Sequence, residues 1–394
     1  MENGVFMHDG VAIELVESDK HLLEVISKLK NCRELALDLE FDQNRYTYGF
    51  NLCLIQLTGG DGTCYIIDPL PLADLSPLFT LLEDPSSMKI IHHSNNDIML
   101  LSKLGCQIKG VMDTDVAAKL LNYERSSLAT VLKEEFNQEI DKSQQSSNWN
   151  KRPLTHDQLK YAAIDVIYLH QVKQRLVEQL EAKGRLEWLK EENQLLEKIR
   201  YSEPENPHLK LRNAFRLNLY QQYILQRLYA FREEMARQFN KPSSFVIGNE
   251  SLVELATDID TDINEWLNHT KGIHGGLKKA RNEQLLIDVI ATAKHDAITE
   301  NISHEFATNR YYRPLKTSET EQRKEMLTQV QKRIMELYGE FTSRLIINQS
   351  IITEYSQTGQ LRCTKQYATA IVLSAAQELN IILPEPEIRA KLNN

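Results

Sequence analysis

The segment from Leu35 to Phe41, Leu-Ala-Leu-Asp-Leu-Glu-Phe, constrains the fold of this chain more than any other part of it. Residues two apart on a β-strand share a face, so Asp38 and Glu40 would project together while the leucines between them face the opposite side. Two neighbouring buried carboxylates repel each other unless a cation pairs them. Mg²⁺ or Mn²⁺, which prefers oxygen ligands, meets that requirement. The alternative is a strand whose solvated face happens to be acidic.

The first 200 residues alternate segments typical of strands with segments typical of helices. The strand segments are short and rich in apolar, β-branched or aromatic residues, and helical stretches lie between and after them. Strands are expected at residues 35–41, 52–58, 63–68 and 89–92, and helices at residues 74–82, 96–104, 115–121, 128–136 and 156–183. The alternation predicts an α/β fold, in which a mixed sheet is flanked by helices.

The rest of the chain is expected to be helical. Residues 202–207 form a polar, proline-containing linker, and the strand signals largely disappear beyond it. We therefore expect an α/β domain at residues 1–200, a helical domain at residues 208–291 and a helical C-terminal region at residues 292–394. A GxxxxGK[ST] loop is absent, which excludes an ATP-driven helicase.

Two later segments carry further candidate site residues. Asp97 follows the fourth expected strand and lies near the start of an apolar helix. There it could cap that helix or complement its dipole, but it would also be aimed at the sheet edge where active sites of such folds lie. Tyr161 and Asp165, four residues apart, would share one face of a helix that Thr155 and Gln158 open with a capping box.

The net charge of −9 is unevenly distributed. Residues 1–200 hold 22 Lys and Arg against 31 Asp and Glu, a difference of −9, whereas residues 201–394 hold 24 of each. A domain that binds divalent cations through carboxylates would show this deficit, because bound metal supplies positive charge. Basic side chains elsewhere are suited to phosphate contact or form solvated helix faces. The candidates for nucleic-acid binding are Arg152, Arg232, Lys241, Lys271, Lys278 and Lys279, together with the aromatic and basic segment 310–313.

The cysteines and the apolar runs bear on the compartment. Five widely spaced cysteines without a CxxC pair argue against a disulfide framework or a zinc ribbon and favour a reducing cytoplasm. Residues 1–17 lack the basic region of a secretory signal. No apolar run approaches the roughly 18 residues that span a bilayer. We expect a cytoplasmic protein with no membrane partner.

Taken together, the acidic motifs resemble the three exonuclease motifs of the DEDDy 3′→5′ exonucleases, whose fold is ribonuclease H-like. The order is D-x-E on a strand, Asp at a strand-to-helix turn and Y-x-x-x-D on a helix. The chain is more similar still to ribonuclease D, because residues 141–145 and 149–154 look like two further segments of that family. Asp113 and Thr114 match another family landmark, in which we interpret Asp113 as a helix cap. The resemblance spans about residues 34–172.

The resemblance implies a reaction and assigns roles to the site residues. Asp38, Glu40, Asp97 and Asp165 would hold two divalent metal ions, Mg²⁺ or Mn²⁺, and Tyr161 would orient the attacking water. The substrate would be single-stranded 3′ ends of RNA, hydrolysed to nucleoside 5′-monophosphates without a nucleotide cofactor. Trimming of tRNA or other structured RNA precursors is the role that the family suggests. His93 departs from the family pattern, which commonly has a small residue there.

The helical remainder carries a second resemblance. Residues 213–291 are similar to an HRDC domain over residues 228–236, 240–247 and 252–256, which implies nucleic-acid binding; the alternative is a helical spacer. Residues 292–394 could be a diverged second HRDC-like domain. Three other functions stay open: a 3′→5′ DNA exonuclease, a non-catalytic nucleic-acid-binding scaffold and a metal-dependent phosphatase on small nucleotides. The scaffold would predict a lost carboxylate, and the phosphatase would leave the basic helical half without a purpose.

Overall fold

The computed structural model describes residues 5–141, 143–306 and 317–388, so Lys142 and the expected contact segment 310–313 lie outside the described residues. The chain divides into two compact units. The first comprises residues 1–40, 52–202 and 314–394, and the second comprises residues 41–51 and 203–313. None of the described helices combines the length and the apolar character needed to cross a membrane.

The first unit is built on a mixed sheet, as the sequence predicts. Within the described residues this sheet has seven strands in the order β1-β2-β5-β4-β3-β6-β7. Its strands are β1 (Val5–His8), β2 (Val11–Val16), β3 (Glu34–Gln43), β4 (Phe50–Thr58), β5 (Thr63–Ile67), β6 (Met88–Ile91) and β7 (Val111–Asp113). The pairs β2–β5, β3–β6 and β6–β7 are parallel, whereas β1–β2 and β4–β5 are antiparallel. The strand β3 that carries Asp38 and Glu40 is therefore an interior strand.

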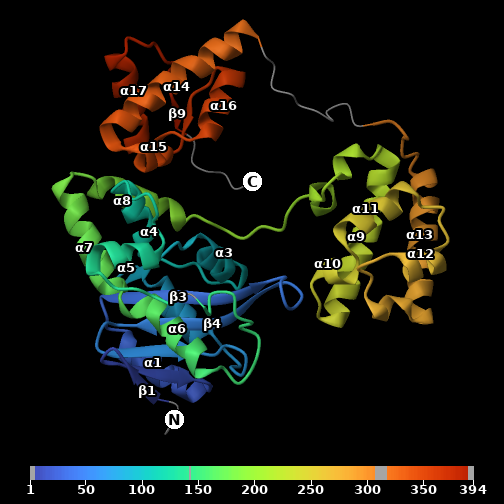
Figure 1. Ribbon diagram of the computed structural model, residues 1–394, viewed down its shortest axis with the longest axis horizontal. Coiled ribbons are helices and arrows are strands. Elements are labelled where there is room, and N and C mark those ends of the chain that lie inside the picture. The colour runs from blue at the N-terminus through green and yellow to red at the C-terminus, as the bar shows by residue number, and fades with distance from the viewer. Residues whose placement is uncertain (1–4, 142, 307–316, 389–394) are drawn as a thin grey trace. The chain divides into compact units, whose positions relative to one another are not determined.

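Helices cover both faces of this sheet (Figure 1). They are α1 (Asp19–Leu29), α2 (Ser76–Glu83), α3 (Asn95–Lys103), α4 (Thr114–Leu120), α5 (Leu128–Phe136), α6 (His156–Ile167), α7 (Leu169–Ala182) and α8 (Leu186–Leu196). The prediction of one continuous helix over residues 156–183 is wrong, because the chain changes direction at Tyr168. This break lets α6 pack on β2 and β5 while α7 packs on β6 and α4.

The C-terminal helices of the first unit pack on α4 and α8. They are α14 (Ser318–Tyr338), α15 (Glu340–Ile346), α16 (Gln349–Thr358) and α17 (Gln366–Glu378), with the short strands β8 (Arg362–Cys363) and β9 (Glu387–Ile388). Trp188 of α8 stacks on Tyr367 at 5.2 Å between ring centroids and meets the ring edge of Tyr338 at 5.4 Å. These contacts join the two parts in one hydrophobic core.

The second unit is helical. Its elements are the 3-10 helices η1 (Pro207–Lys210), η2 (Ala214–Arg216) and η3 (Gly275–Lys278) and the α-helices α9 (Leu219–Phe239), α10 (Ser243–Val246), α11 (Asn249–Thr257), α12 (Ile263–His269) and α13 (Ala280–Thr299). The long helices α9 and α13 pack against each other, and the buried core gathers around α9. The expected domain boundary at residue 291 falls inside α13.

Candidate active site

The β3 strand presents Asp38 and Glu40 as the alternation of its sequence predicts. Leu37 and Leu39 are buried on the opposite face, whereas Asp38 and Glu40 are only partly covered. β3 lies between β4 and β6, and its first residues, Glu34 to Ala36, pair with β6 in parallel register. The strand therefore holds the two carboxylates at a fixed spacing on one face of the sheet.

Helix α6 brings the third carboxylate to this face. Its first turn is closed by the expected capping box: the Thr155 hydroxyl accepts from the Gln158 N–H at 3.2 Å, and the Gln158 side chain accepts from the Thr155 N–H at 3.0 Å. Ala162 and Ala163 are fully buried against the sheet, and their small side chains allow close approach. Asp165 is thereby placed next to β3.

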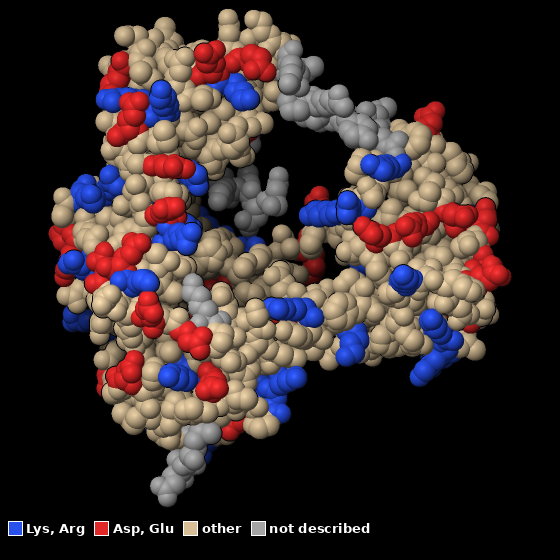
Figure 2. All heavy atoms as spheres, in the orientation of Figure 1, with Lys and Arg blue, Asp and Glu red and all other residues tan. Residues whose placement is uncertain are grey.

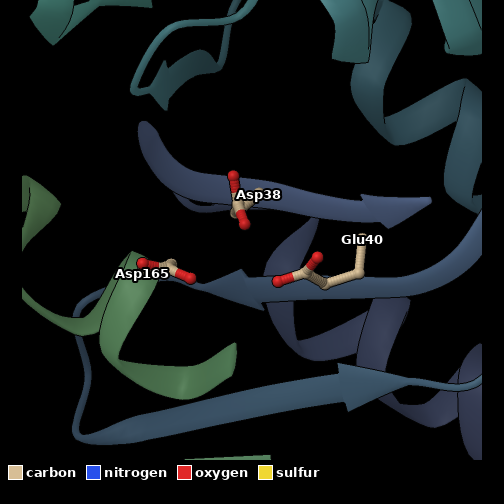
Figure 3. A group of neighbouring side chains, drawn as sticks. All are labelled: Asp38, Glu40 and Asp165. Carbon is tan, nitrogen blue, oxygen red and sulfur yellow. The ribbon is translucent and has the colours of Figure 1, made fainter. Parts of the chain in front are cut away.

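Three carboxylates converge at this place. Asp38, Glu40 and Asp165 each offer one oxygen, and these three oxygens all lie within 4.8 Å of one another. Figure 3 shows the Glu40 and Asp165 side chains turned toward the space beside Asp38. In the part of the chain that the structure describes, none of the three forms an ion pair with a basic side chain. The three acids are thus gathered without a protein cation to balance them.

Asp97 is the fourth candidate and lies close to this group, although outside the three that share the 4.8 Å limit. It sits in the first turn of α3, directly after β6, and is 5% exposed. The negative charge of Asp97 raises the pKa of Asp38 and of Glu40. All four acidic side chains that the sequence singled out therefore interact electrostatically.

Burial and mutual repulsion raise the pKa values of this group. Burial, followed by the charges of Asp165, Asp97 and Glu40, raises the pKa of Asp38 well above its ordinary value. The same two causes, with Asp165 as the strongest neighbour, raise the pKa of Glu40. Burial raises the pKa of Asp165 to about 7, and burial together with the Asp113 charge raises that of Asp97 to about 7. A nearby cation would reverse these shifts, because it favours the ionised form.

The donor set fits a hard divalent metal ion. Its donor atoms are all oxygens. A ligand set made only of oxygens favours Mg²⁺ and Mn²⁺ over Zn²⁺ and copper. The carboxylates are close enough to share a cation, and their clustering is costly without one. None of the five cysteines belongs to the group, so among the described residues the group includes no soft ligand.

Tyr161 lies one turn before Asp165 on α6, beside the carboxylates. Its ring centroid is 6.2 Å from that of Trp149, which is buried. Burial, followed by the charges of Asp165, Glu40 and Asp38, raises the pKa of the Tyr161 phenol. In the metal-free site the hydroxyl therefore stays protonated at neutral pH and can donate a hydrogen bond.

Two of the basic candidates are engaged inside the fold. The Arg152 guanidinium pairs with Asp68 and donates to the carbonyl oxygens of Cys53 at 2.9 Å and Trp149 at 2.7 Å. Arg232 is 3% exposed and donates to Asn249 at 2.7 Å. Both arginines stabilise local structure in these positions.

The four lysine candidates lie on the surface of the second unit. All of them are exposed: Lys241, Lys271, Lys278 and Lys279. On the face drawn in Figure 2, basic and acidic side chains are interspersed, without one continuous basic surface.

The residue whose importance sequence reasoning underestimated is Asp113. Its predicted role as a helix cap is confirmed, because it accepts from the N–H groups of Asp115 and Val116 at the start of α4. It also accepts from His93 and Ser94, in the turn that leads to Asp97. The match of Asp113 and Thr114 to a family landmark was the signal available in the sequence. The bonds from His93 and Ser94, which lie 20 and 19 residues away, leave no local sequence pattern.

Comparison with known proteins gives a consistent family. A family model described as 3'-5' exonuclease matches residues 13–181. Ribonuclease D of Escherichia coli is 30% identical over 293 residues, which cover 73% of this chain and 77% of that protein. Ribonuclease D of Granulibacter bethesdensis is 32% identical over 284 residues, covering 71% of each chain. Ribonuclease D of Desulfotalea psychrophila is 34% identical over 247 residues, covering 61% of this chain and 66% of that protein.

Solved structures give the same fold. The crystal structure of Escherichia coli RNase D, described as an exoribonuclease involved in structured RNA processing, has a TM-score of 0.70 at 23% identity. It is matched over 93% of this chain and 99% of its own. A protein from Bifidobacterium adolescentis has a TM-score of 0.73 at 19% identity over 92% of this chain. The predicted fold, a ribonuclease H-like sheet with a large helical part, is confirmed.

Proposed function

Because the chain belongs to the ribonuclease D family, and is therefore a 3′→5′ exoribonuclease, we propose that it cleaves its substrate with two divalent metal ions held by Asp38, Glu40, Asp97 and Asp165. The observation that carries this proposal is the convergence of three carboxylate oxygens within 4.8 Å, with Asp97 close by. The loss of one of these carboxylates would have favoured a non-catalytic scaffold, but all four acids and Tyr161 are present.

The four carboxylates and Tyr161 would have different roles in the reaction. The bound ions would activate a water molecule and stabilise the departing 3′-oxygen of an in-line displacement. Asp38 and Glu40, fixed on β3, would hold the cations from the sheet, while Asp97 and Asp165 would complete the ligand set from two helices. The protonated Tyr161 hydroxyl would donate a hydrogen bond that orients the attacking water. The products would be nucleoside 5′-monophosphates.

The helical second unit would help to hold the RNA. We assign to it the role of an HRDC domain, with Lys241, Lys271, Lys278 and Lys279 as exposed phosphate contacts. The Escherichia coli relative is described as acting in structured RNA processing. The substrate proposed for this chain is accordingly the single-stranded 3′ end of tRNA or another structured precursor.

The test is digestion of a 5′-labelled single-stranded RNA, beside the matching DNA, with Mg²⁺, with Mn²⁺ or with EDTA. We expect a ladder that shortens from the 3′ end, disappears with EDTA and releases nucleoside 5′-monophosphates. The variant Asp38→Asn should lower kcat by on the order of 10³-fold or more, because it removes a charge that the metal-bound transition state requires. Asp61→Asn, an exposed aspartate of the same unit, is the matched control and should leave the rate unchanged.

Each outcome decides a separate part of the proposal. Full activity in EDTA, or near-normal turnover by Asp38→Asn, would rule out the two-metal assignment. Faster cleavage of DNA than of RNA would replace the proposed substrate and keep the chemistry.

A further inference from the structure

The turn between β6 and α3, which leads to Asp97, has an unusual backbone. His93 has a φ of 65°, a left-handed conformation that is uncommon for residues other than Gly, although His adopts it more readily than most, as Asn and Asp do. Ser94, at the helix N-cap, does not cap α3 with its own side chain. The start of α3 is thus left without a side-chain cap from its own N-cap residue, and a contact from elsewhere in the chain can stabilise this turn.

Asp113 provides that contact. Its Oδ1 accepts from the His93 N–H at 3.1 Å, and its Oδ2 accepts from the N–H and the hydroxyl of Ser94, both at 2.8 Å. Oδ1 also accepts from the N–H groups of Asp115 at 2.8 Å and Val116 at 3.3 Å. The carboxylate is fully buried, and such charge-assisted bonds are stronger than neutral ones. One side chain thus holds both the turn before α3 and the start of α4.

Asp113 is itself held rigidly. It ends strand β7, where it is paired with Ile91 of β6. Its backbone N–H donates to the Asn193 side-chain oxygen of α8 at 3.2 Å. The Asn193 amide nitrogen in turn contacts the Met112 sulfur at 3.6 Å. The acceptor for the turn is therefore anchored on the sheet and on α8, and the position of Asp97 depends on both.

We propose that Asp113 is a positioning residue for Asp97, which sets the affinity of the metal site without touching the metal. The inference rests on the proposed function, because it takes Asp97 to be a metal ligand. Residues that orient a metal ligand from behind commonly affect metal affinity by about 10- to 100-fold. Replacement by Asn keeps the size of the side chain but loses the negative charge and one of the two acceptor oxygens. The turn would then lose its bonds from His93 or from Ser94.

The test is calorimetric titration of the full chain with Mn²⁺ alone, without RNA. We expect Asp113→Asn to raise the Mn²⁺ dissociation constant about tenfold or more. Ser94→Ala removes a single bond to the same carboxylate and should raise it by a smaller factor. Glu135→Gln is the matched control, because Glu135 also accepts from several side chains of the first unit, among them Arg175 and Gln179, but none of these contacts involves the turn before α3. Its dissociation constant should stay within about twofold of the wild type.

The results separate this inference from the proposed function. A wild-type chain that binds no Mn²⁺ would overturn the metal site itself, and this inference with it. Wild-type binding with an unchanged dissociation constant in folded Asp113→Asn would overturn only the role of Asp113. If Asp113→Asn does not fold, Ser94→Ala decides: a raised dissociation constant supports the inference, and an unchanged one overturns it. High Mn²⁺ should also restore kcat in Asp113→Asn, whereas it cannot restore Asp38→Asn.

Discussion

At the scale of single residues, the surroundings of Tyr161 determine the protonation state of its hydroxyl. Its pKa is raised by burial and by three neighbouring carboxylates, so the phenol remains a hydrogen-bond donor. A protonated phenol can orient the attacking water by a hydrogen bond, which is the role proposed for Tyr161. The raised pKa values of Asp97 and Asp165 have a different consequence. When no metal is bound, ionisation of these two carboxyl groups near neutral pH destabilises the folded protein.

Removal of the Tyr161 hydroxyl should slow the chemical step. We expect Tyr161→Phe to lower kcat by about 10²-fold with little change in KM. This factor is the lower end of what a positioned proton donor contributes to the rate. Tyr65→Phe is the control, since Tyr65 is a buried tyrosine of β5 outside the group of carboxylates. Single-turnover rates with Mg²⁺ measure the effect. A kcat that is unchanged in Tyr161→Phe would remove Tyr161 from the mechanism.

The stability of the metal-free protein should depend on pH through Asp165. The pKa of Asp165 is about 7 in the folded protein and about 3.9 in an unfolded chain. Because the folded pKa is raised, the stability that Asp165 contributes is fully present below about pH 4 and is lost as pH rises through 7. In EDTA, Asp165→Asn should therefore exceed the wild type in Tm at pH 8, and by less at pH 5.5. A Tm difference that does not change with pH would contradict the raised pKa.

At the scale of secondary structure, caps and turns place the functional residues. The capping box fixes the start of α6, and its position sets where Asp165 meets the sheet. The junction between α4 and α15 depends on a similar device. Asn122, in a left-handed conformation with φ 70°, accepts from the N–H groups of Phe341 at 2.8 Å and Thr342 at 3.3 Å. The side chain that ends α4 thus caps α15.

Gly339 should be indispensable at this junction. It has a φ of 90°, and a Cβ there would lie 2.2 Å from the Asn122 side chain. Gly339→Ala should lower the free energy of unfolding by about 2 kcal/mol more than Gly184→Ala does. Gly184 is the matched control, since its φ is 66° but a Cβ there would meet nothing within 4 Å. Urea unfolding compares the two variants. Equal losses would show that only the backbone conformation matters at residue 339.

At the scale of the whole molecule, the two units differ in charge and in proposed task. The acidic first half carries the proposed metal site, and the second unit carries the exposed lysines proposed to contact phosphate. The C-terminal helices belong to the first unit, where Glu191 accepts from the N–H groups of Gln366 and Tyr367, and Glu192 accepts from the Tyr367 hydroxyl. Helix α17 therefore stabilises α8, on which the anchoring of Asp113 depends.

The exposed lysines of the second unit should govern affinity for long RNA, not chemistry. We expect the double variant Lys278→Ala/Lys279→Ala to raise KM for a long single-stranded RNA several-fold while kcat is unchanged. If each lysine contacts one phosphate, the slope of log affinity against log salt should fall by about 1.4. Lys20→Ala/Lys190→Ala, two exposed lysines of the first unit, is the control. An unchanged salt slope would exclude Lys278 and Lys279 from binding.

The sequence by itself determined where the acidic side chains of the first unit lie on their own strand and helix. The alternation in residues 35–41 placed Asp38 and Glu40 on one face, because a strand has a period of two. The capping box at Thr155 located α6, because a helix start is specified by residues three apart. These are local signals, and the structure confirms both.

Only the tertiary structure decided which distant side chains meet. Arg152 pairs with Asp68, 84 residues away in sequence, and Arg232 is buried. Neither contact has a local sequence signal. The break at Tyr168 follows from packing on different strands, which helical periodicity does not record. The bonds from Asp113 to the turn before Asp97, like the docking of the C-terminal helices on α8, arise from long-range packing. Such contacts leave no periodic pattern in a single sequence, because each depends on the position of two separate elements.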